Sequence, residues 1–266
     1  MMLRVLVACE FSGIVRDAFT ARGHFARSVD LLPTESLAQP VKFRGMLSCF
    51  DHPVRDPTCW DCVNDEPWCH EHGMYAYECS CLGPTEDEAE YADDCEHGAR
   101  HLTGDLFTVE DIESYDLLIA HPPCTHLACS GNRWLKRHFV RKSRNGRCVG
   151  GYWHDPTEKR RQLKESVDFV LKIWSLPVKR KALENPVGRL STLWKKPTQI
   201  IQPWQYGHGE VKKTCLWLDN LPKLNPTNVV AGREERIWNM PPSEDRGKLR
   251  SIFYTGIAEA MADQWS

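Results

Sequence analysis

The sequence predicts an α/β fold with a Rossmann-like sheet and a small inserted Cys/His-rich module. Residues 3–30 alternate strand, helix and strand, and two later buried apolar runs end in polar residues. Seven cysteines crowd into residues 49–95, which indicates the module. Because 266 residues with 41% hydrophobic content can bury one sizeable core, we expect one domain over residues 1–266, with the module inserted at residues 46–98.

The first thirty residues are typical of a nucleotide-binding β-α-β unit. A β-branched strand over Leu3–Ala8 is followed by a turn at Ser12 and Gly13, and an amphipathic helix ends at Gly23. The second strand ends at Asp30, where an acid can accept hydrogen bonds from ribose hydroxyls. The turn lacks G-x-G-x-x-G, which favours a cofactor without phosphates, such as S-adenosylmethionine, over NAD.

Residues 101–124 predict a further strand that leads to the same edge of the sheet. After a turn at Gly104 and Asp105 we expect a short helix with Thr108 as its N-cap, and then a buried strand that delivers Cys124. Ligands bind at the carboxyl ends of strands in open α/β sheets. One crevice should therefore collect the strand-end residues Glu10, Asp30, Asp105 and Cys124.

Two prolines precede Cys124 and would hold it on a preset turn, because each proline fixes φ and removes a backbone donor. Such rigidity suits a nucleophile. The alternative is an ordinary strand exit with a buried free thiol, since free cysteine packs as a small hydrophobe.

Downstream, residues 155–178 predict a core-covering helix with Asp155 as its N-cap. Glu184 and Asn185 follow at the end of another short strand, before a proline, and again at the edge of the crevice. The alternative for this pair is an ordinary loop, because turns favour these residue types.

These residues together resemble the DNA cytosine-C5 methyltransferases, especially the short, phage-type branch. Pro122-Pro123-Cys124 matches the nucleophile motif and Glu184-Asn185 the Glu-Asn motif, and the similarity extends to a closing helix at "FYTGIAEAMADQW". The resemblance implies a class I S-adenosylmethionine-dependent methyltransferase fold. Its implied catalytic residues are Cys124, Glu184 and Asn185. Its implied cofactor-binding residues are Phe11, Ser12, Gly13, Asp30, Asp105 and Leu106.

The chain departs from this family where the larger enzymes carry a Gln-x-Arg-x-Arg motif. Here "QPWQYGHGEVKKTCLWL" offers Lys212 and Lys213 without an arginine pair, and the segment before the closing helix is far shorter than a normal target-recognition domain. Lysine grips phosphate as a point charge and does not read guanine in a bidentate manner. DNA recognition should therefore be short or loose.

A basic loop is expected after Cys124, and its density of cations is best explained by DNA phosphates. The alternative is a solvated charged loop. The cations are Arg133, Lys136, Arg137, Arg141, Lys142, Arg144 and Arg147.

The module predicts a structural zinc site, because zinc takes four soft ligands in a tetrahedron. The most compact complete set is Cys69, His72, Cys79 and Cys81, with Cys59 and Cys62 as a rival pair or half of a second site. The alternative is a group of free thiols in a polar loop.

The expected activity is transfer of a methyl group from S-adenosylmethionine to cytosine C5 in DNA. A catalytically silent DNA-binding or decoy protein and a modifier of free cytosine nucleotides remain alternatives. The net charge of −2 excludes a uniformly basic coat, and the chain has no apolar stretch of membrane-spanning length. We expect a soluble monomer of the cytoplasm, or of the host-cell cytoplasm if a phage encodes it, with DNA and no membrane as partner.

Overall fold

The computed structural model describes residues 2–32, 68–69, 74–75, 101–144, 147–241, 243 and 246–266. The chain divides into two compact units, one formed by residues 1–34 and 103–266 and the other by residues 35–102. In the second unit β3 (Trp68–Cys69) and β4 (Met74–Tyr75) pair antiparallel. All other elements below belong to the first unit, apart from the start of β5.

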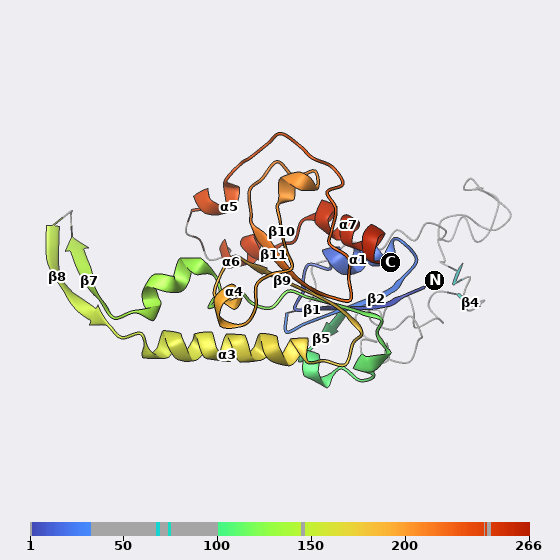
Figure 1. Ribbon diagram of the computed structural model, residues 1–266, viewed down its shortest axis with the longest axis horizontal. Helices are drawn as coiled ribbons and strands as arrows, with labels where there is room; N and C mark the ends of the chain where they lie inside the picture. The colour runs from blue at the N-terminus through green and yellow to red at the C-terminus, as the bar shows by residue number, and fades with distance from the viewer. Residues whose placement is uncertain are drawn as a thin grey trace. The chain divides into compact units, whose positions relative to one another are not determined.

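A mostly parallel, mixed sheet of seven strands forms the centre of the first unit (Figure 1), in the order β10-β11-β9-β6-β1-β2-β5. Parallel pairing joins β1 to β2 and β6, and β6 to β9, whereas β11 runs antiparallel to β9 and β10. The predicted α/β fold with a Rossmann-like sheet is confirmed at this level. The strands are β1 (Arg4–Ala8), β2 (Phe25–Asp30), β5 (His101–Thr103), β6 (Leu117–Ala120), β9 (Arg180–Pro186), β10 (Gln199–Ile201) and β11 (Thr214–Asp219).

Helices cover both faces of the sheet, with α1 and α7 on one face and α3 on the other (Figure 1). Val5 and Val7 of β1 pack in one core cluster with α1 and α7, and Leu183 and Trp217 pack in another with α3. This follows from the two-residue period of strands, which sends successive side chains to opposite faces. The helices are α1 (Ile14–Thr20), α3 (Thr157–Trp174), α4 (Leu190–Leu193), α5 (Arg236–Asn239), α6 (Arg246–Ser251) and α7 (Thr255–Trp265).

The order of strands reverses between β1 and β6. From β1 the chain adds β2 and β5 on one side, and later adds β6 and β9 on the other. The loops after β1 and β6 therefore diverge, and ligands of open α/β sheets bind at such a switch point. This geometry directs attention to the carboxyl ends of β1, β2, β6 and β9.

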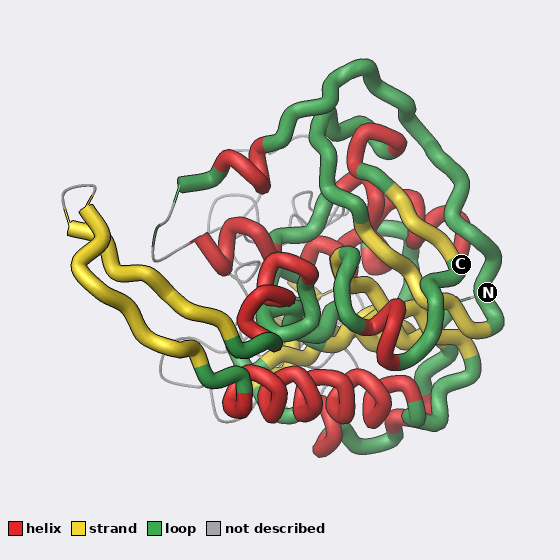
Figure 2. Tube along the Cα trace, turned by 60° about the vertical axis from the view of Figure 1, so that its left-hand side comes forward, coloured by secondary structure: helices red, strands yellow, loops and turns green. Residues whose placement is uncertain are grey.

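The sequence analysis predicted a basic loop after Cys124. The structure instead contains an antiparallel ribbon of β7 (His138–Arg144) and β8 (Arg147–His154) there. This ribbon projects from the body of the unit (Figure 2). The cross-strand pairing of aromatic and β-branched residues, such as Phe139 with Trp153, favours strands over a solvated loop.

The helix expected after Thr108 is also absent, and two 3-10 turns stand in its place, Leu106–Thr108 and Ile112–Ser114. Asp105, not Thr108, caps the first turn, because its Oδ1 accepts the N–H of Phe107 at 3.0 Å. Asp111 takes a left-handed φ of 52°, which ends any continuous helix there.

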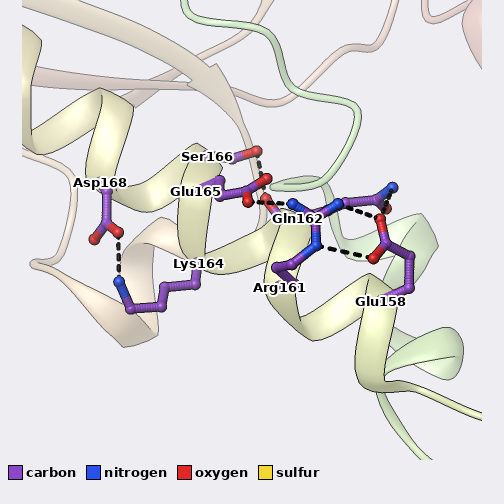
Figure 3. Close-up of polar contacts among 7 residues, drawn as sticks. All are labelled: Glu158, Arg161, Gln162, Lys164, Glu165, Ser166 and Asp168. Carbon is purple, nitrogen blue, oxygen red and sulfur yellow. Dashed lines mark hydrogen bonds and ion pairs between the residues drawn. The ribbon is translucent and has the colours of Figure 1, made fainter.

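Ion pairs three and four residues apart cover the outer face of α3 (Figure 3). Arg161 bonds Glu158 at 2.7 Å and also Glu165, and Lys164 bonds Asp168 at 2.6 Å. Arg161 and Lys164 of α3 are therefore matched by acids of the same helix. Within the described ranges, no helix has both the length and the apolar composition needed to cross a membrane.

The segment after β9 comes unusually close to the loop after β6. Arg189 N–H donates to the carbonyl of Leu127 at 2.7 Å, and Cys129 N–H donates to the carbonyl of Val187 at 3.2 Å. A Cβ on Gly188 would lie 2.0 Å from the Leu127 carbonyl oxygen. Only glycine fits between these two backbone segments.

Gly188→Ala should lower the free energy of unfolding by about 1–3 kcal/mol or more, because the new methyl group overlaps backbone that cannot rotate away. Chemical denaturation measures this loss. Gly247→Ala is the matched control, since it lies in α6 with open space around it and should leave stability unchanged or slightly raised. Equal stability of the Gly188 variant and the wild type would contradict the close approach.

Candidate functional site

The candidate site is built where β9 extends beyond β6. The last parallel pair joins Ala120 of β6 to Leu183 of β9, and β9 continues to Pro186 while paired with β11. Glu184 and Asn185 therefore lie beside the loop that carries Cys124. The sequence placed them at the strand end, and the structure places them within the last residues of β9.

Asn185 ties β9 to this loop. Its side chain is buried, and Nδ2 donates to the carbonyl of Pro122 at 2.8 Å. The two prolines have no N–H of their own, and the Asn185 amide of the neighbouring strand gives the Pro122 carbonyl a donor. Among the described residues, Asn185 Oδ1 has no hydrogen-bond partner.

His121 contacts Glu184 and was missed by the sequence analysis. His121 Nδ1 lies 3.3 Å from Glu184 Oε2, and both side chains are nearly buried. The His121 N–H donates to the carbonyl of Ala8, and its ring packs against Phe253 at 4.7 Å between centroids. Nε2 is buried without a partner in the part of the chain that the structure describes. The signal was a titratable residue directly before the Pro-Pro-Cys motif.

Cys124 begins a tight turn and carries an accessible thiol. Its carbonyl accepts the N–H groups of Leu127 and Ala128 at 3.0 and 2.9 Å. Desolvation by the surrounding chain raises the pKa of the thiol, and the Glu184 carboxylate raises it further. Two nearby cations, Lys212 and Arg250, oppose this rise in the pKa. The free protein therefore holds Cys124 as a thiol at neutral pH.

Lys212 is held in place beside this group. Its N–H donates to Gln202 Oε1 at 3.0 Å, and its Nζ donates to the carbonyl of Arg250 at 3.1 Å. Of the two candidate lysines, Lys212 is partly buried near Cys124, whereas Lys213 is exposed.

A second group gathers Cys9, Asp30 and Asp105 at the ends of β1, β2 and β5. Burial raises the pKa of Cys9 to about 12, and the charges of Asp30 and Asp105 contribute to the rise. Gly104 N–H donates to the Asp30 carbonyl at 2.9 Å, which links the two acidic turns. Each carboxylate is fixed by a backbone donor, since Asp30 Oδ1 accepts the N–H of Leu32 at 2.9 Å.

The turn residues Phe11, Ser12 and Gly13 lie between β1 and α1, and Leu106 is buried directly after Asp105. Ser12 Oγ donates to Glu10 Oε1 at 3.1 Å. Gly13 has a φ of 72°, a left-handed conformation that favours glycine.

The sequence analysis placed Glu10 in the crevice, but its carboxylate is used elsewhere in the structure. It is buried, and its Oε1 accepts the N–H of Val15 at 2.8 Å, while Oε2 accepts the N–H of Arg16 at 3.4 Å. The first N–H groups of a helix have no partner within the helix, and a carboxylate can accept hydrogen bonds from them. Glu10 therefore stabilises the N-terminus of α1.

Of the four predicted zinc ligands, one lies among the described residues. Cys69 lies in β3, and His72, Cys79 and Cys81 lie outside the described residues. In the rest of the chain that the structure describes, no cluster of three or more His, Cys, Asp or Glu residues could hold a metal ion.

Comparison with models of known protein families found no match, and comparison with curated proteins found none either.

Glu184→Gln should lower the pKa of Cys124 because it removes a neighbouring negative charge, and Lys212→Met should raise it because it removes a positive one. The pH dependence of iodoacetamide alkylation measures both shifts, with the Cys124 peptide resolved by mass spectrometry. Glu158→Gln, on the outer face of α3, is a control with no expected shift. If Glu184→Gln and the wild type titrate alike, the carboxylate does not act on the thiol.

Proposed function

We propose that the chain is a DNA cytosine-C5 methyltransferase that transfers a methyl group from S-adenosylmethionine to a flipped cytosine. The main supporting observation is that Cys124 lies in electrostatic contact with Glu184 and Lys212 on a loop fastened by Asn185. A nucleophile, a carboxyl group and a cation are the groups that this chemistry needs.

Cys124 would act as the nucleophile. Cytosine C5 is a poor nucleophile, and a bond between the Cys124 sulfur and C6 breaks the C5–C6 double bond and pushes its electron pair toward C5 and N3. After C5 has taken the methyl group, loss of the C5 proton to solvent re-forms the C5–C6 double bond and expels the Cys124 thiolate. The raised pKa of the free thiol means that proton loss must accompany base binding. Lys212 and Arg250 favour the thiolate electrostatically once Glu184 becomes protonated or hydrogen-bonded to the base.

Glu184 would hold the N3 edge of the cytosine, where a carboxyl group relieves the electron density that the thiolate adds. His121 would position Glu184, since its Nδ1 lies 3.3 Å from the carboxylate. Asn185 fixes the loop through Pro122. Because C6 is covered by stacking in duplex DNA, the target base must be flipped out, at a cost of a few kcal/mol.

The residues at the ends of β1, β2 and β5 fit S-adenosylmethionine, which supplies the methyl group when bound. Asp30 would accept hydrogen bonds from the ribose hydroxyls, and Asp105 with Leu106 would border the adenine. Phe11, Ser12 and Gly13 would form the turn beside the methionine part. Two fixed carboxylates suit a ligand with hydroxyl donors and a sulfonium cation, and repel the phosphates of a dinucleotide. This assignment also makes the sheet that of a class I methyltransferase.

A structural zinc ion held by Cys69, His72, Cys79 and Cys81 remains part of the proposal, on the spacing of these ligands in the sequence. The basic ribbon and Lys212 would contact DNA phosphates.

The deciding experiment is mass spectrometry of nucleosides from DNA incubated with the protein and labelled S-adenosylmethionine. We expect labelled 5-methylcytosine from the wild type and none from Cys124→Ser, whose affinity for S-adenosylmethionine should stay within a few-fold. Transfer by the serine variant near the wild-type rate would contradict the role of Cys124. Absence of transfer by the wild type, with DNA binding intact, would favour a silent DNA-binding protein.

Asp30→Ala should raise the dissociation constant for S-adenosylmethionine about tenfold or more, because a charge-assisted hydrogen bond is worth about 1.5–3 kcal/mol. Calorimetry measures the change. The matched control is Asp116→Ala, since Asp116 accepts the N–H of Arg4 at the opposite ends of the strands. Unchanged binding by the Asp30 variant would remove Asp30 from the site.

A further inference from the structure

The β7–β8 ribbon has the dimensions of a groove-binding element. Its strands comprise seven and eight residues, so at about 3.3 Å per residue it extends roughly 20–25 Å. Figure 2 shows it projecting away from the sheet and helices. The major groove of DNA admits a two-stranded ribbon of this kind.

The charge of the ribbon is of one sign. From His138 to His154 the sequence contains four cationic Lys and Arg residues (Arg141, Lys142, Arg144 and Arg147) and no aspartate or glutamate. On α3, in contrast, Arg161 and Lys164 are paired with acids of the same helix (Figure 3). The ribbon therefore presents positive charge that its own strands do not neutralise, which complements a polyanion.

Glycines leave the ribbon cations room to reach a partner. Arg141 pairs across the ribbon with Gly151, and Lys142 pairs with Gly150, so the residue directly opposite each cation has no side chain. Gly151 is needed for a second reason, because a Cβ there would lie 2.5 Å from the Phe139 ring.

Exposed aromatic residues accompany the cations. Trp153 and Tyr152 are 60% and 48% exposed. Arg137 lies over the Trp153 ring at 5.2 Å, and Lys142 lies over the Tyr152 ring at 5.8 Å. Solvent-exposed rings of this size indicate a surface that a partner covers.

The base of the ribbon is fastened to the segment that follows the nucleophile loop. Trp134, His138 and His154 pack their rings together, and His154 Nε2 lies 2.9 Å from the Trp134 carbonyl oxygen. Arg160 of α3 donates to the Leu135 carbonyl at 3.0 Å. These contacts fasten the base of the ribbon to the segment that follows the Cys124 loop.

We infer that the β7–β8 ribbon binds in the major groove of duplex DNA beside the flipped base, with Arg141 at the base edges, in place of a target-recognition domain. The inference rests on the proposed function and adds which part of the structure recognises the DNA. A duplex is favoured over a single strand because the major groove admits a two-stranded ribbon, and because a cation lies over each of the two exposed rings.

The test is equilibrium binding of labelled duplexes of random sequence, about three helical turns long, over a range of salt concentrations. Arg141→Met/Arg147→Met should weaken binding at least tenfold and reduce the slope of log affinity against log salt by about 1–2, since each phosphate contact contributes about 0.9. Arg161→Met/Lys164→Met removes the same number of charges from α3 and is the matched control, with a change of less than about threefold. Both variants alter exposed side chains, and an unchanged midpoint of thermal unfolding verifies that each is folded.

Equal losses of duplex affinity in the two double variants would overturn the inference. A ribbon variant that loses more affinity for single-stranded DNA than for duplex DNA would also overturn it. The assay requires no methyl transfer, so the two proposals fail separately. If the protein transfers methyl groups but the ribbon variant binds DNA as the wild type does, only the inference is overturned. If the ribbon is needed for duplex binding but no methyl group is transferred, only the proposed function is overturned. In active protein, Arg141→Met should also broaden the set of methylated sequences in genomic DNA.

Discussion

The hydrogen bond from the Asn185 amide to the Pro122 carbonyl is the contact on which the candidate site depends. Two consecutive prolines stiffen this turn, and the Pro122 carbonyl accepts its hydrogen bond from the neighbouring strand. β9 supplies it because β9 runs on after β6 has ended. The absence of a side chain at Gly188 then lets the two backbones close on each other, and Glu184 and Cys124 become neighbours.

Charge is divided across the switch point of the sheet. On the side of β1 and β2, Cys9 feels the negative charges of Asp30 and Asp105. On the side of β6 and β11, Cys124 lies near the Glu184 carboxylate and also near the positive charges of Lys212 and Arg250. The first environment suits a cationic ligand with hydroxyl groups and the second suits a polyanion, so the two halves of the proposed reaction would meet across one sheet edge.

The net charge of −2 hides this division, and local structure decides what each charged segment does. On α3 the helical repeat brings acids and bases together at three and four residues, so the charges of Arg161 and Lys164 are paired on the helix surface. The ribbon has no acids between His138 and His154, so its cations stay available. Two basic stretches of similar density in the sequence thus have different electrostatic roles.

The sequence by itself determined the sheet and the edge at which the site lies, because buried apolar runs, a glycine turn and strand-end acids are local signals. It also marked Asp30, Asp105, Cys124, Glu184 and Asn185, which follow or end those runs. Only the tertiary structure decided that Glu10 serves the helix α1, that His121 contacts Glu184, and that the basic segment is a ribbon. These three outcomes depend on partners distant in sequence or on competition for backbone donors, and local patterns do not encode such contacts.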